Sequence, residues 1–454
     1  MYKLRDYQQE AVDICLKHME SSSTSKGVLV APTSSGKSLI AANIAKELGG
    51  RTVVFQPSKE LLEQNYEKYT AYGNEAGIYS ASVGRKDVGD VTFATAGSVK
   101  NMSDFFRQHK VKNVLVDECH FASGPGMMLH KFIKETRVRN VIGMTATPFI
   151  MKAKQFEKVR PVMLHKTHKS MFTEMLHIIQ IQEMVNNNYW SPLIYEVMDI
   201  DRNAYKLNST GGDFTHLSLQ EGYRYNDVES KVLVSLEKLL AEGHKSIIVF
   251  VPTVDQAERL AKIIKDAEVI SSRTKKNERD RIITGFKNLD IPILINCKLL
   301  SIGFDHPQLT GLIMARPVSS VTLYYQILGR AVRIHPEKEF AKVIDIAGNV
   351  EMFGRIEDFR FIDSIANGWE LYSGKTQITN VAVDKLLKKL KDKADDTKGL
   401  NSFKIKFGKH KGKPITAVDT SYLEWVNSTF NFYGEYGREL KKQVKKELKR
   451  RQSV

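Results

Sequence analysis

The 454-residue sequence has few cysteines and no long apolar run, and each absence excludes a class of protein. Its three cysteines, Cys15, Cys119 and Cys297, lie far apart and lack metal-ligand spacing, so neither a disulfide framework nor a zinc site is expected. No stretch of about 18 apolar residues exists, which argues against a membrane-spanning helix. The start of the chain is charged from Lys3 onward and has no signal-peptide core. These absences predict a cytoplasmic protein without a membrane association.

Positive charge is plentiful and concentrated near the end of the chain. The formal net charge is +16, and residues 385–454 hold 19 Lys and Arg against 8 Asp and Glu, a net of +11. The remaining 384 residues therefore carry only +5. A basic segment of this kind favours a polyanion as partner, most often nucleic acid. A solvated segment that only keeps the protein soluble is the alternative.

Short β-rich apolar runs alternate with helix-period segments, which predicts an α/β fold with two doubly wound parallel sheets. The length of the chain suggests two or three domains. Strands are predicted at 28–31, 52–55, 91–94, 113–116 and 141–144, and again at 246–251, 269–271, 292–296, 311–315 and 342–346. The expected domains are residues 1–195, residues 196–384 beginning with a polar linker around 201–226, and a small basic module with its own linker at 385–454.

Residues 28–38 read VLVAPTSSGKS and resemble a phosphate-binding loop between a strand and a helix, with Ala31 where a glycine is usual. Gly36 lets the backbone approach phosphate, Lys37 supplies a point charge for the β- and γ-phosphates, and Ser38 can bind Mg²⁺. Thr33, Ser34 and Ser35 complete the expected phosphate cradle. A serine-rich loop with a chance Gly-Lys-Ser is the alternative interpretation.

Two adjacent carboxylates, Asp117 and Glu118, end the predicted strand at 113–116. A strand end of this kind places Asp117 to hold Mg²⁺, commonly through water, and Glu118 to orient and deprotonate an attacking water. Together with the phosphate loop, the pair predicts a nucleoside triphosphatase.

Further motifs extend this pattern, and from about Leu4 to about Ile346 the sequence resembles the superfamily 2 helicases and translocases. The matching segments are LRDYQQEAV (4–12), QPSKELLEQ (56–64), ATAGSV (94–99), DECH (117–120), MTATP (144–148), VFVPTVDQAERL (249–260), INCKLLSIGFDHP (295–307) and YYQILGRAVR (324–333). They occur in the order that the family has.

The resemblance implies two RecA-like motor domains with ATP and Mg²⁺ bound between them. By position in the motifs, Arg5 and Gln8 would read the adenine, Gly303 and Asp305 would meet the ribose, Gln326 would sense the γ-phosphate, Arg330 and Arg333 would be the arginine fingers, and Thr145 and Thr147 would couple hydrolysis to movement. Such a finger contributes roughly 10³–10⁵ in rate.

Hydroxyl residues in the remaining motifs are expected to contact the phosphates of a nucleic-acid strand. They are Ser58, Thr95, Ser98, Thr253 and Ser301. For each one, a role as the cap of a turn or helix is the alternative. Cys297 falls where many relatives carry a hydroxyl residue, and we expect it to be a small buried filler.

The DECH box and Gln326, together with LRDYQQEAV (4–12), look more like the DNA-repair branch, including RadD-like and UvsW-like phage helicases that remodel forks and junctions. The resemblance therefore implies a monomeric DNA helicase acting on forked, branched or single-stranded DNA. An RNA helicase, a duplex translocase that never separates strands, and a DNA-binding protein switched by ATP are the alternatives.

Two basic segments outside the motor motifs are further candidates for nucleic-acid contact. Residues 151–170 form an expected basic arm that includes Lys152, Lys154 and Lys158, with a solvated helix face and connector as the alternative. In the terminal module, the candidate contacts are Lys404, Lys406, Lys409, Lys411 and Lys413. Aromatic residues lie among and after these lysines, and of these we expect Trp425 to belong to the core of the module.

Overall fold

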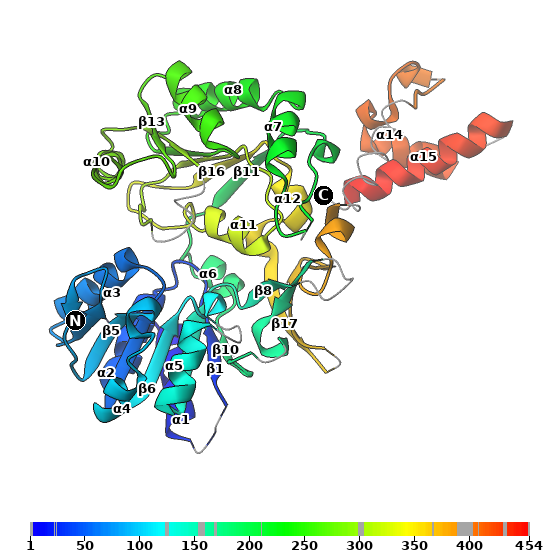
Figure 1. The fold of residues 1–454 in the computed structure, drawn as a ribbon. Helices are drawn as coiled ribbons and strands as arrows, with labels where there is room; N and C mark the ends of the chain where they lie inside the picture. The colour runs from blue at the N-terminus through cyan, green and yellow to red at the C-terminus, as the bar shows by residue number, and fades with distance from the viewer. Residues whose placement is uncertain are drawn as a thin grey trace. The chain divides into compact units, whose positions relative to one another are not determined.

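The computed structural model describes residues 3–21, 23, 25–122, 127–152, 159–167, 170–209, 211–297, 304–365, 367–387, 403–406, 408–429 and 434–452. Contacts divide the chain into two compact units, Met1–Val383 and Asp384–Val454. The first unit holds two lobes, each built on its own parallel sheet, coloured blue to cyan and green to yellow in Figure 1. Within the described residues, no helix combines the length and apolarity needed to cross a membrane.

The first lobe is built on an eight-stranded sheet. In spatial order its strands are β10 (Glu174–Ile178), β1 (Gly27–Val30), β7 (Asn140–Thr145), β6 (Val111–Asp117), β2 (Arg51–Gln56), β5 (Val91–Thr95), β3 (Gly77–Ser80) and β4 (Arg85–Lys86). All pairs are parallel except β3 with β4. The helices are α1 (Asp6–Glu20), α2 (Lys37–Glu47), α3 (Lys59–Ala71), α4 (Ser103–Gln108), α5 (Met128–Thr136) and α6 (Ile181–Asn186). Short 3₁₀ turns lie at Ala96–Val99, Cys119–Phe121 and Leu164–Lys166.

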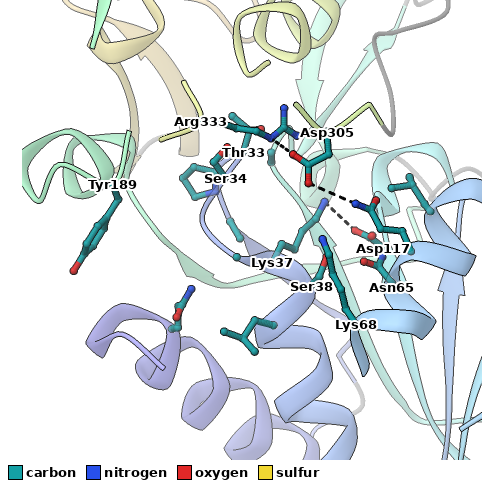
Figure 2. A pocket seen from close by; sticks show the side chains of 18 of the residues that line it. Thr33, Ser34, Lys37, Ser38, Asn65, Lys68, Asp117, Tyr189, Asp305 and Arg333 are labelled. Carbon is teal, nitrogen blue, oxygen red and sulfur yellow. Dashed lines mark hydrogen bonds and ion pairs between the residues drawn. The ribbon is translucent and has the colours of Figure 1, made fainter. Parts of the chain in front are cut away.

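The carboxyl ends of β1, β6 and β7 meet at one edge of this sheet, as parallel strands must. Strand β1 is buried along its whole length and leads into the phosphate loop, while β6 ends at Asp117 and β7 at Thr145. Lys37 and Asp117 consequently point toward one another (Figure 2).

The second lobe is built on a six-stranded, wholly parallel sheet. Its strands in spatial order are β11 (Leu193–Val197), β16 (Ala341–Asp345), β15 (Gly311–Met314), β12 (Ile247–Phe250), β14 (Ile293–Asn296) and β13 (Ala267–Ile270). Its helices are α7 (His216–Tyr225), α8 (Val228–Ala241), α9 (Val254–Ile263), α10 (Lys276–Lys287), α11 (Val321–Leu328) and α12 (Asn349–Phe353).

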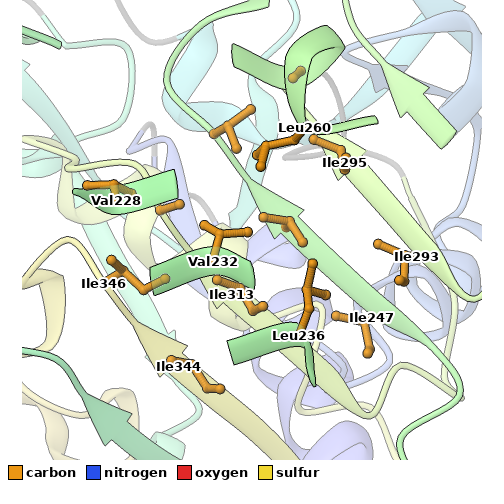
Figure 3. Close-up of a cluster of buried hydrophobic side chains, with 14 of the residues drawn as sticks. Val228, Val232, Leu236, Ile247, Leu260, Ile293, Ile295, Ile313, Ile344 and Ile346 are labelled. Carbon is orange, nitrogen blue, oxygen red and sulfur yellow. The ribbon is translucent and has the colours of Figure 1, made fainter. Parts of the chain in front are cut away.

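Aliphatic side chains form the core of the second lobe. Val232 and Leu236 of α8 share a buried cluster with Ile247 and Ile313 of the neighbouring strands (Figure 3). Spacing of three to four residues places these α8 side chains on one helix face. Cys297 is 3% exposed and belongs to the same cluster, which confirms the expectation of a buried filler.

Several expectations about the secondary structure were incomplete or wrong. Strands β3, β4, β10 and β11 were not predicted, because they are short or mix polar and apolar residues at half-buried sites. Since β11 pairs with β16, residues 193–195 lie in the second sheet, although the expected boundary assigned them to the first domain.

Residues 201–226 were expected to be a polar linker, yet they contain a 3₁₀ turn at Arg202–Ala204 and helix α7. The α7 helix starts at Thr215, whose side chain accepts a hydrogen bond from Ser218 N. It is then held by the buried side chains of Leu219 and Tyr223.

Two small β structures complete the first unit. A hairpin joins β8 (Phe149–Lys152) to β9 (Arg160–Met163), and a three-stranded antiparallel sheet contains β17 (Phe359–Ser364), β18 (Gly368–Ser373) and β19 (Thr376–Gln377), preceded by a 3₁₀ turn at Ile356–Asp358. The described part of the expected basic arm is thus largely hairpin, whereas Lys154 and Lys158 lie outside the described residues.

The three-stranded sheet follows the second lobe in sequence but bonds to the first. Gln180 Nε2 donates to Phe361 O at 2.8 Å, Asn380 N donates to Pro161 O at 2.7 Å, and Lys166 pairs with the buried Glu370. The arm's Lys166 is therefore engaged within the protein.

The second unit has a small core of its own. It contains 3₁₀ turns at Gly408–His410 and Ile415–Ala417 and helices α14 (Thr420–Thr429) and α15 (Gly434–Gln452). The core residues are Ile405, Ile415, Val418, Leu423, Val426, Leu440 and Val444. The expectation that Trp425 belongs to this core is wrong, because its side chain is 47% exposed.

Candidate functional site

The phosphate loop runs from the end of β1 to the start of α2. Gly36 is the N-cap of α2 and has a φ of +79°, a left-handed conformation that favours glycine. A Cβ atom at Gly36 would lie 2.4 Å from Gln8 Nε2, so a larger residue would also displace that side chain. Ala31 is fully buried, and its N–H donates to Thr145 O at 3.0 Å. The usual glycine is therefore not needed at position 31, where a small buried residue follows β1.

Lys37 lies against both carboxylates of the DECH box. Its Nζ is 2.8 Å from Asp117 Oδ1 and 2.5 Å from Glu118 Oε1. Burial alone would lower the pKa of Lys37, but the charges of Asp117 and Glu118 raise it above its ordinary value. Burial raises the pKa of Asp117. At Glu118 burial is again the largest single influence, but the charge and hydrogen bond of Lys37, together with His120 and Thr145, outweigh it and lower the pKa. Glu118 is thus held ionised, as a residue that accepts hydrogen bonds from water must be.

Glu118 also connects to β7 through two buried side chains. Thr145 Oγ1 donates to Glu118 Oε2 at 3.4 Å and lies 2.9 Å from His120 Nδ1. Burial lowers the pKa of His120 to about 4, so the imidazole is neutral at pH 7. The N–H of Thr147 bonds back to Thr145 Oγ1 at 3.0 Å. The two expected coupling residues, Thr145 and Thr147, are therefore joined to the carboxylate that was expected to orient water.

The start of α1 supports the other side of the loop. Gln8 Nε2 and the hydroxyl of Tyr7 each donate to Ser35 O at 2.8 Å. The guanidinium of Arg5 lies 3.8 Å from the centroid of the Tyr189 ring. Arg5, Gln8 and Tyr189 line the same cavity as the phosphate loop, which gives this cavity an aromatic and amide-bearing end suited to a purine.

Residues of the second lobe line this cavity from the opposite side, and four of them were expected site residues. These four are Asp305, Gln326, Arg330 and Arg333. The cavity measures about 550 Å³ and includes Thr33, Ser34, Gly36, Lys37, Ser38, Asp117 and Glu118 of the first lobe. Both arginines therefore face the phosphate loop.

Internal contacts hold the arginines in place. Arg333 Nε lies 2.7 Å from Asp305 Oδ1, and Gln64 Nε2 donates to Asp305 Oδ2 at 3.5 Å (Figure 2). Arg330 donates to the carbonyl of Phe304. Burial and the neighbouring Arg333 lower the pKa of Arg330 to about 9, which leaves it charged at neutral pH.

The donor set fits a magnesium-bound nucleoside triphosphate. Among the described residues, no group of three or more His, Cys, Asp and Glu side chains could hold a metal unaided. Ser38 and Asp117 nevertheless line one cavity with Lys37, and Mg²⁺ is usually bound by one or two carboxylates together with substrate phosphates.

Not every expected site residue is brought to this cavity. Ser35 is 1% exposed and does not line it, although its carbonyl anchors Tyr7 and Gln8. Ser301 and Gly303 lie outside the described residues.

A second cavity of about 1010 Å³ lies on the other side of the DECH box. Ser58 and Thr95 line it from the first lobe, and Lys276 and Arg279 line it from α10 of the second. Ser98 and Thr253, which were also expected to contact a nucleic-acid strand, do not line it.

The four hydroxyl candidates within the described residues have structural partners. Ser58 accepts from Leu61 N and Thr253 from Gln256 N, each at 3.3 Å at a helix start, and Ser98 accepts from Ala81 N at 2.9 Å. Thr95 Oγ1 lies 2.8 Å from Ser98 Oγ. Ser58 and Thr253 therefore each cap a helix. Contact of these hydroxyl residues with a nucleic-acid strand stays a prediction.

Several residues at the lobe contact were missed from sequence. Trp190 Nε1 donates to Thr33 O at 2.8 Å, and Thr33 N donates to the hydroxyl of Tyr325 at 3.2 Å. Lys338 Nζ donates to Ala331 O at 2.6 Å and to Arg333 O at 2.8 Å. Trp190 lies in no motif and contacts a segment distant in the chain, and Lys338 bonds to backbone carbonyls within the second lobe, so residue types gave no signal for either.

Comparisons with known proteins agree with this division into two lobes. Residues 1–150 match the family described as "Type III restriction enzyme, res subunit", and residues 231–335 match the "Helicase conserved C-terminal domain". A Saccharomyces cerevisiae protein named as a proposed ATP-dependent helicase, IRC3, is 24% identical over 420 residues, covering 85% of this chain and 59% of the yeast protein. The "DNA 3'-5' translocase XPB2" of Sulfurisphaera tokodaii is 23% identical over 363 residues, covering 73% of this chain and 79% of that protein.

Among solved structures, the ATP-dependent type ISP restriction-modification enzyme LlaBIII bound to DNA has the same fold over 76% of this chain and 28% of its own. The TM-score is 0.53 and the identity 17%. The chain thus spans only part of several relatives. One helicase-related family match falls in each lobe, and together with the two sheets this agrees with the expected pair of RecA-like domains.

Proposed function

We propose that this chain hydrolyses ATP to drive movement along DNA, and that it remodels branched DNA such as forks and four-way junctions. One observation carries the proposal: a single cavity brings Lys37, Asp117 and Glu118 of one lobe to face Arg330 and Arg333 of the other. Hydrolysis that needs residues from both lobes can be linked to the distance between them.

Each residue then has a definite task. Lys37 exchanges its two carboxylate partners for the β- and γ-phosphates, and Glu118, freed from Lys37, orients the attacking water. Mg²⁺ held by Ser38 and Asp117 would neutralise phosphate charge. Arg330 stabilises charge that develops on the transferring phosphoryl group, and Arg333 joins it once released from Asp305.

Two features support the coupling of hydrolysis to movement. The side chains of Thr145 and His120 connect Glu118 to the end of β7. The second cavity places Ser58 and Thr95 opposite Lys276 and Arg279, so a strand held there would touch both lobes. Closing and opening of the lobes would then change the spacing of the two sets of contacts and move the strand.

The positive charge of residues 385–454 and the similarity to a DNA translocase favour DNA as the substrate. Residues 385–454 carry a net charge of +11, and a relative that matches 73% of this chain is named a DNA translocase. The preference for branched DNA rests on the resemblance of the DECH box and Gln326 to branch-migrating helicases. We further propose that the active form is a monomer.

The test is an ATPase assay with single-stranded DNA, duplex DNA, a four-way junction and RNA as separate activators, together with a junction-unwinding assay. We expect stimulation by DNA, strongest with the junction, and unwinding by the wild type only. Lys37→Ala should abolish hydrolysis and unwinding. Glu118→Gln should slow hydrolysis by about 10²–10⁴ while retaining ATP binding.

Each alternative function predicts a different pattern. Preference for RNA would make the chain an RNA helicase, and ATPase activity on duplex without unwinding would make it a translocase. DNA binding that changes with ATP, without DNA-stimulated hydrolysis or unwinding, would make ATP a conformational switch and overturn the motor.

A further inference from the structure

Helix α14 in the second unit carries two stripes of apolar side chains on different faces. Leu423 and Val426 are fully buried in the core, whereas Tyr422 and Trp425 lie one residue earlier, about 100° around the helix. Tyr422 is half-buried against the core, and Trp425 is 47% exposed. An exposed indole in a unit whose core is made of smaller residues is the kind of exposed aromatic group that marks a binding surface.

Neighbouring groups hold the ring of Tyr422 beneath this tryptophan. The Tyr422 and Trp425 ring centroids are 5.4 Å apart with a tilt of 41°, and the ring of His410 meets Tyr422 edge-on at 4.5 Å. Gly408 has a φ of +66°, and a Cβ atom there would lie 2.5 Å from the Tyr422 hydroxyl. The turn at Gly408–His410 is therefore packed closely against Tyr422, which limits the mobility of the aromatic pair.

A lysine lies beside the Tyr422 ring, and two more lysines follow it in the chain. Lys409 Nζ lies 5.4 Å from the centroid of the Tyr422 ring, and Lys411 and Lys413 follow it in the same exposed turn. Two carboxylates are also near: Asp419 lies 2.9 Å from His410 Nε2, and Glu424 is exposed beside Trp425. The net charge of +11 over residues 385–454 nevertheless makes the unit strongly basic.

We propose that Trp425, supported by Tyr422, is a stacking platform for an unpaired base of single-stranded DNA, with the exposed lysines of the adjoining turn holding the flanking phosphates. This site deepens the proposed function, on which it rests, by assigning the second unit a part of the substrate. An indole can stack on a base only when that base is out of the duplex, so the site selects single-stranded DNA at a fork or junction over intact duplex.

The chemistry favours a nucleic acid over a protein as the occupant. Lysine is depleted at protein–protein interfaces, whereas aromatic rings beside cations are typical of surfaces that bind single strands. Stacking on an aromatic side chain tolerates any base, so we expect little dependence on sequence.

The experiment measures binding of the full-length protein to a single-stranded oligonucleotide by fluorescence anisotropy, at several salt concentrations and without nucleotide. Trp425→Ala should weaken binding roughly 5- to 150-fold, while Trp425→Phe should recover much of the loss. Because no charge is removed, the slope of log affinity against log salt should be unchanged in Trp425→Ala. A Lys409→Gln, Lys411→Gln, Lys413→Gln triple variant should instead reduce that slope.

Tyr225→Ala is the matched control, since Tyr225 is 71% exposed in the second lobe of the motor and should bind DNA as the wild type does. Equal affinity of Trp425→Ala and wild type for the single strand would overturn the platform. So would a shift of Trp425→Ala from dimer to monomer in sedimentation, which would make the tryptophan a protein contact.

The two proposals fail in different ways. A protein with no DNA-stimulated ATPase activity but with Trp425-dependent binding of single strands would refute the motor and keep the platform. DNA-stimulated hydrolysis together with Trp425-independent binding would do the reverse. Circular dichroism of each variant, with Trp425→Phe as the conservative substitution, separates lost binding from lost folding.

Discussion

The backbone N–H of Thr33 donates a hydrogen bond of 3.2 Å to the phenolic oxygen of Tyr325, so the phosphate loop of the first lobe rests on helix α11 of the second. Trp190 reinforces the contact, because its indole N–H donates to Thr33 O and its ring lies 6.4 Å from that of Tyr325. Helix α11 leads directly into Arg330. The expected phosphate loop and the helix that leads into Arg330 are thus in physical contact.

Tyr325→Phe should lower the ATPase kcat roughly fivefold, the loss expected for one hydrogen bond of about 1 kcal/mol. Tyr324→Phe is a matched control: the neighbouring hydroxyl donates to Gly354 O at 2.6 Å, away from the phosphate loop. Steady-state kinetics at saturating DNA should separate the two. Equal effects of both substitutions would show that Tyr325 serves only the stability of the lobe.

Arg330→Ala should reduce kcat by about 10³ or more with little change in ATP affinity, because a finger acts mainly in the transition state. Arg281→Ala removes an equally charged but exposed side chain from α10 of the same lobe, and we expect wild-type kinetics from it. A large rise in the KM for ATP with unchanged kcat would mean that Arg330 binds the ground state.

Lys338→Met should loosen the segment that carries Arg330 and Arg333, because Lys338 holds the backbone of this segment in place. Lys338 Nζ donates to the carbonyls of Ala331, Arg333 and Pro307, so its loss leaves buried acceptors without partners at a cost of about 1–3 kcal/mol. We expect lower kcat and lower thermal stability together. Lys265→Met, at an exposed site of the second lobe, should change neither, and kinetics with thermal unfolding on both variants decides the matter.

His120 should make the protein sensitive to mild acid. Burial lowers the pKa of His120 from 6.5 to about 4, so between these values the unfolded chain binds a proton that the folded chain does not. The free energy of unfolding should therefore fall as the pH drops from 6.5 toward 4, by at most roughly 3 kcal/mol from this residue.

Urea unfolding across that pH range measures the effect. His120→Gln should flatten the dependence relative to the wild type, whereas His216→Gln, at an exposed position on α7, should not. Comparing variants is essential, since His306 titrates in the same direction and Asp345, whose pKa burial raises to about 6, in the opposite one. Identical slopes for His120→Gln and wild type would contradict the prediction.

Local sequence was sufficient to place the expected phosphate loop between a buried strand and a helix and Asp117 at the end of a strand, because both patterns depend on residues adjacent in the chain. Lys37 and Asp117 could be assigned roles before their 2.8 Å contact was known. Lys338 could not, because its hydrogen bonds go to backbone carbonyls and leave no pattern in residue types.

Trp425 illustrates a different limit. Tyr422, Leu423, Trp425 and Val426 are all apolar or aromatic, so helical periodicity alone does not decide which pair faces inward. The choice depends on Leu440 and Val444 of α15, which pack on Leu423 and Val426. Short strands such as β10 were missed for a related reason, since half-buried polar and apolar residues give no clear alternation.

The sheet formed by β17, β18 and β19 gives the motor a second attachment between its lobes. The polypeptide crosses once at residues 189–193 and returns when this sheet bonds to Gln180 and Pro161 of the first lobe. These two chain connections constrain the second lobe more than a single linker would. If the chain hydrolyses ATP as proposed, these attachments would favour opening and closing of the lobes about one line over other relative motions.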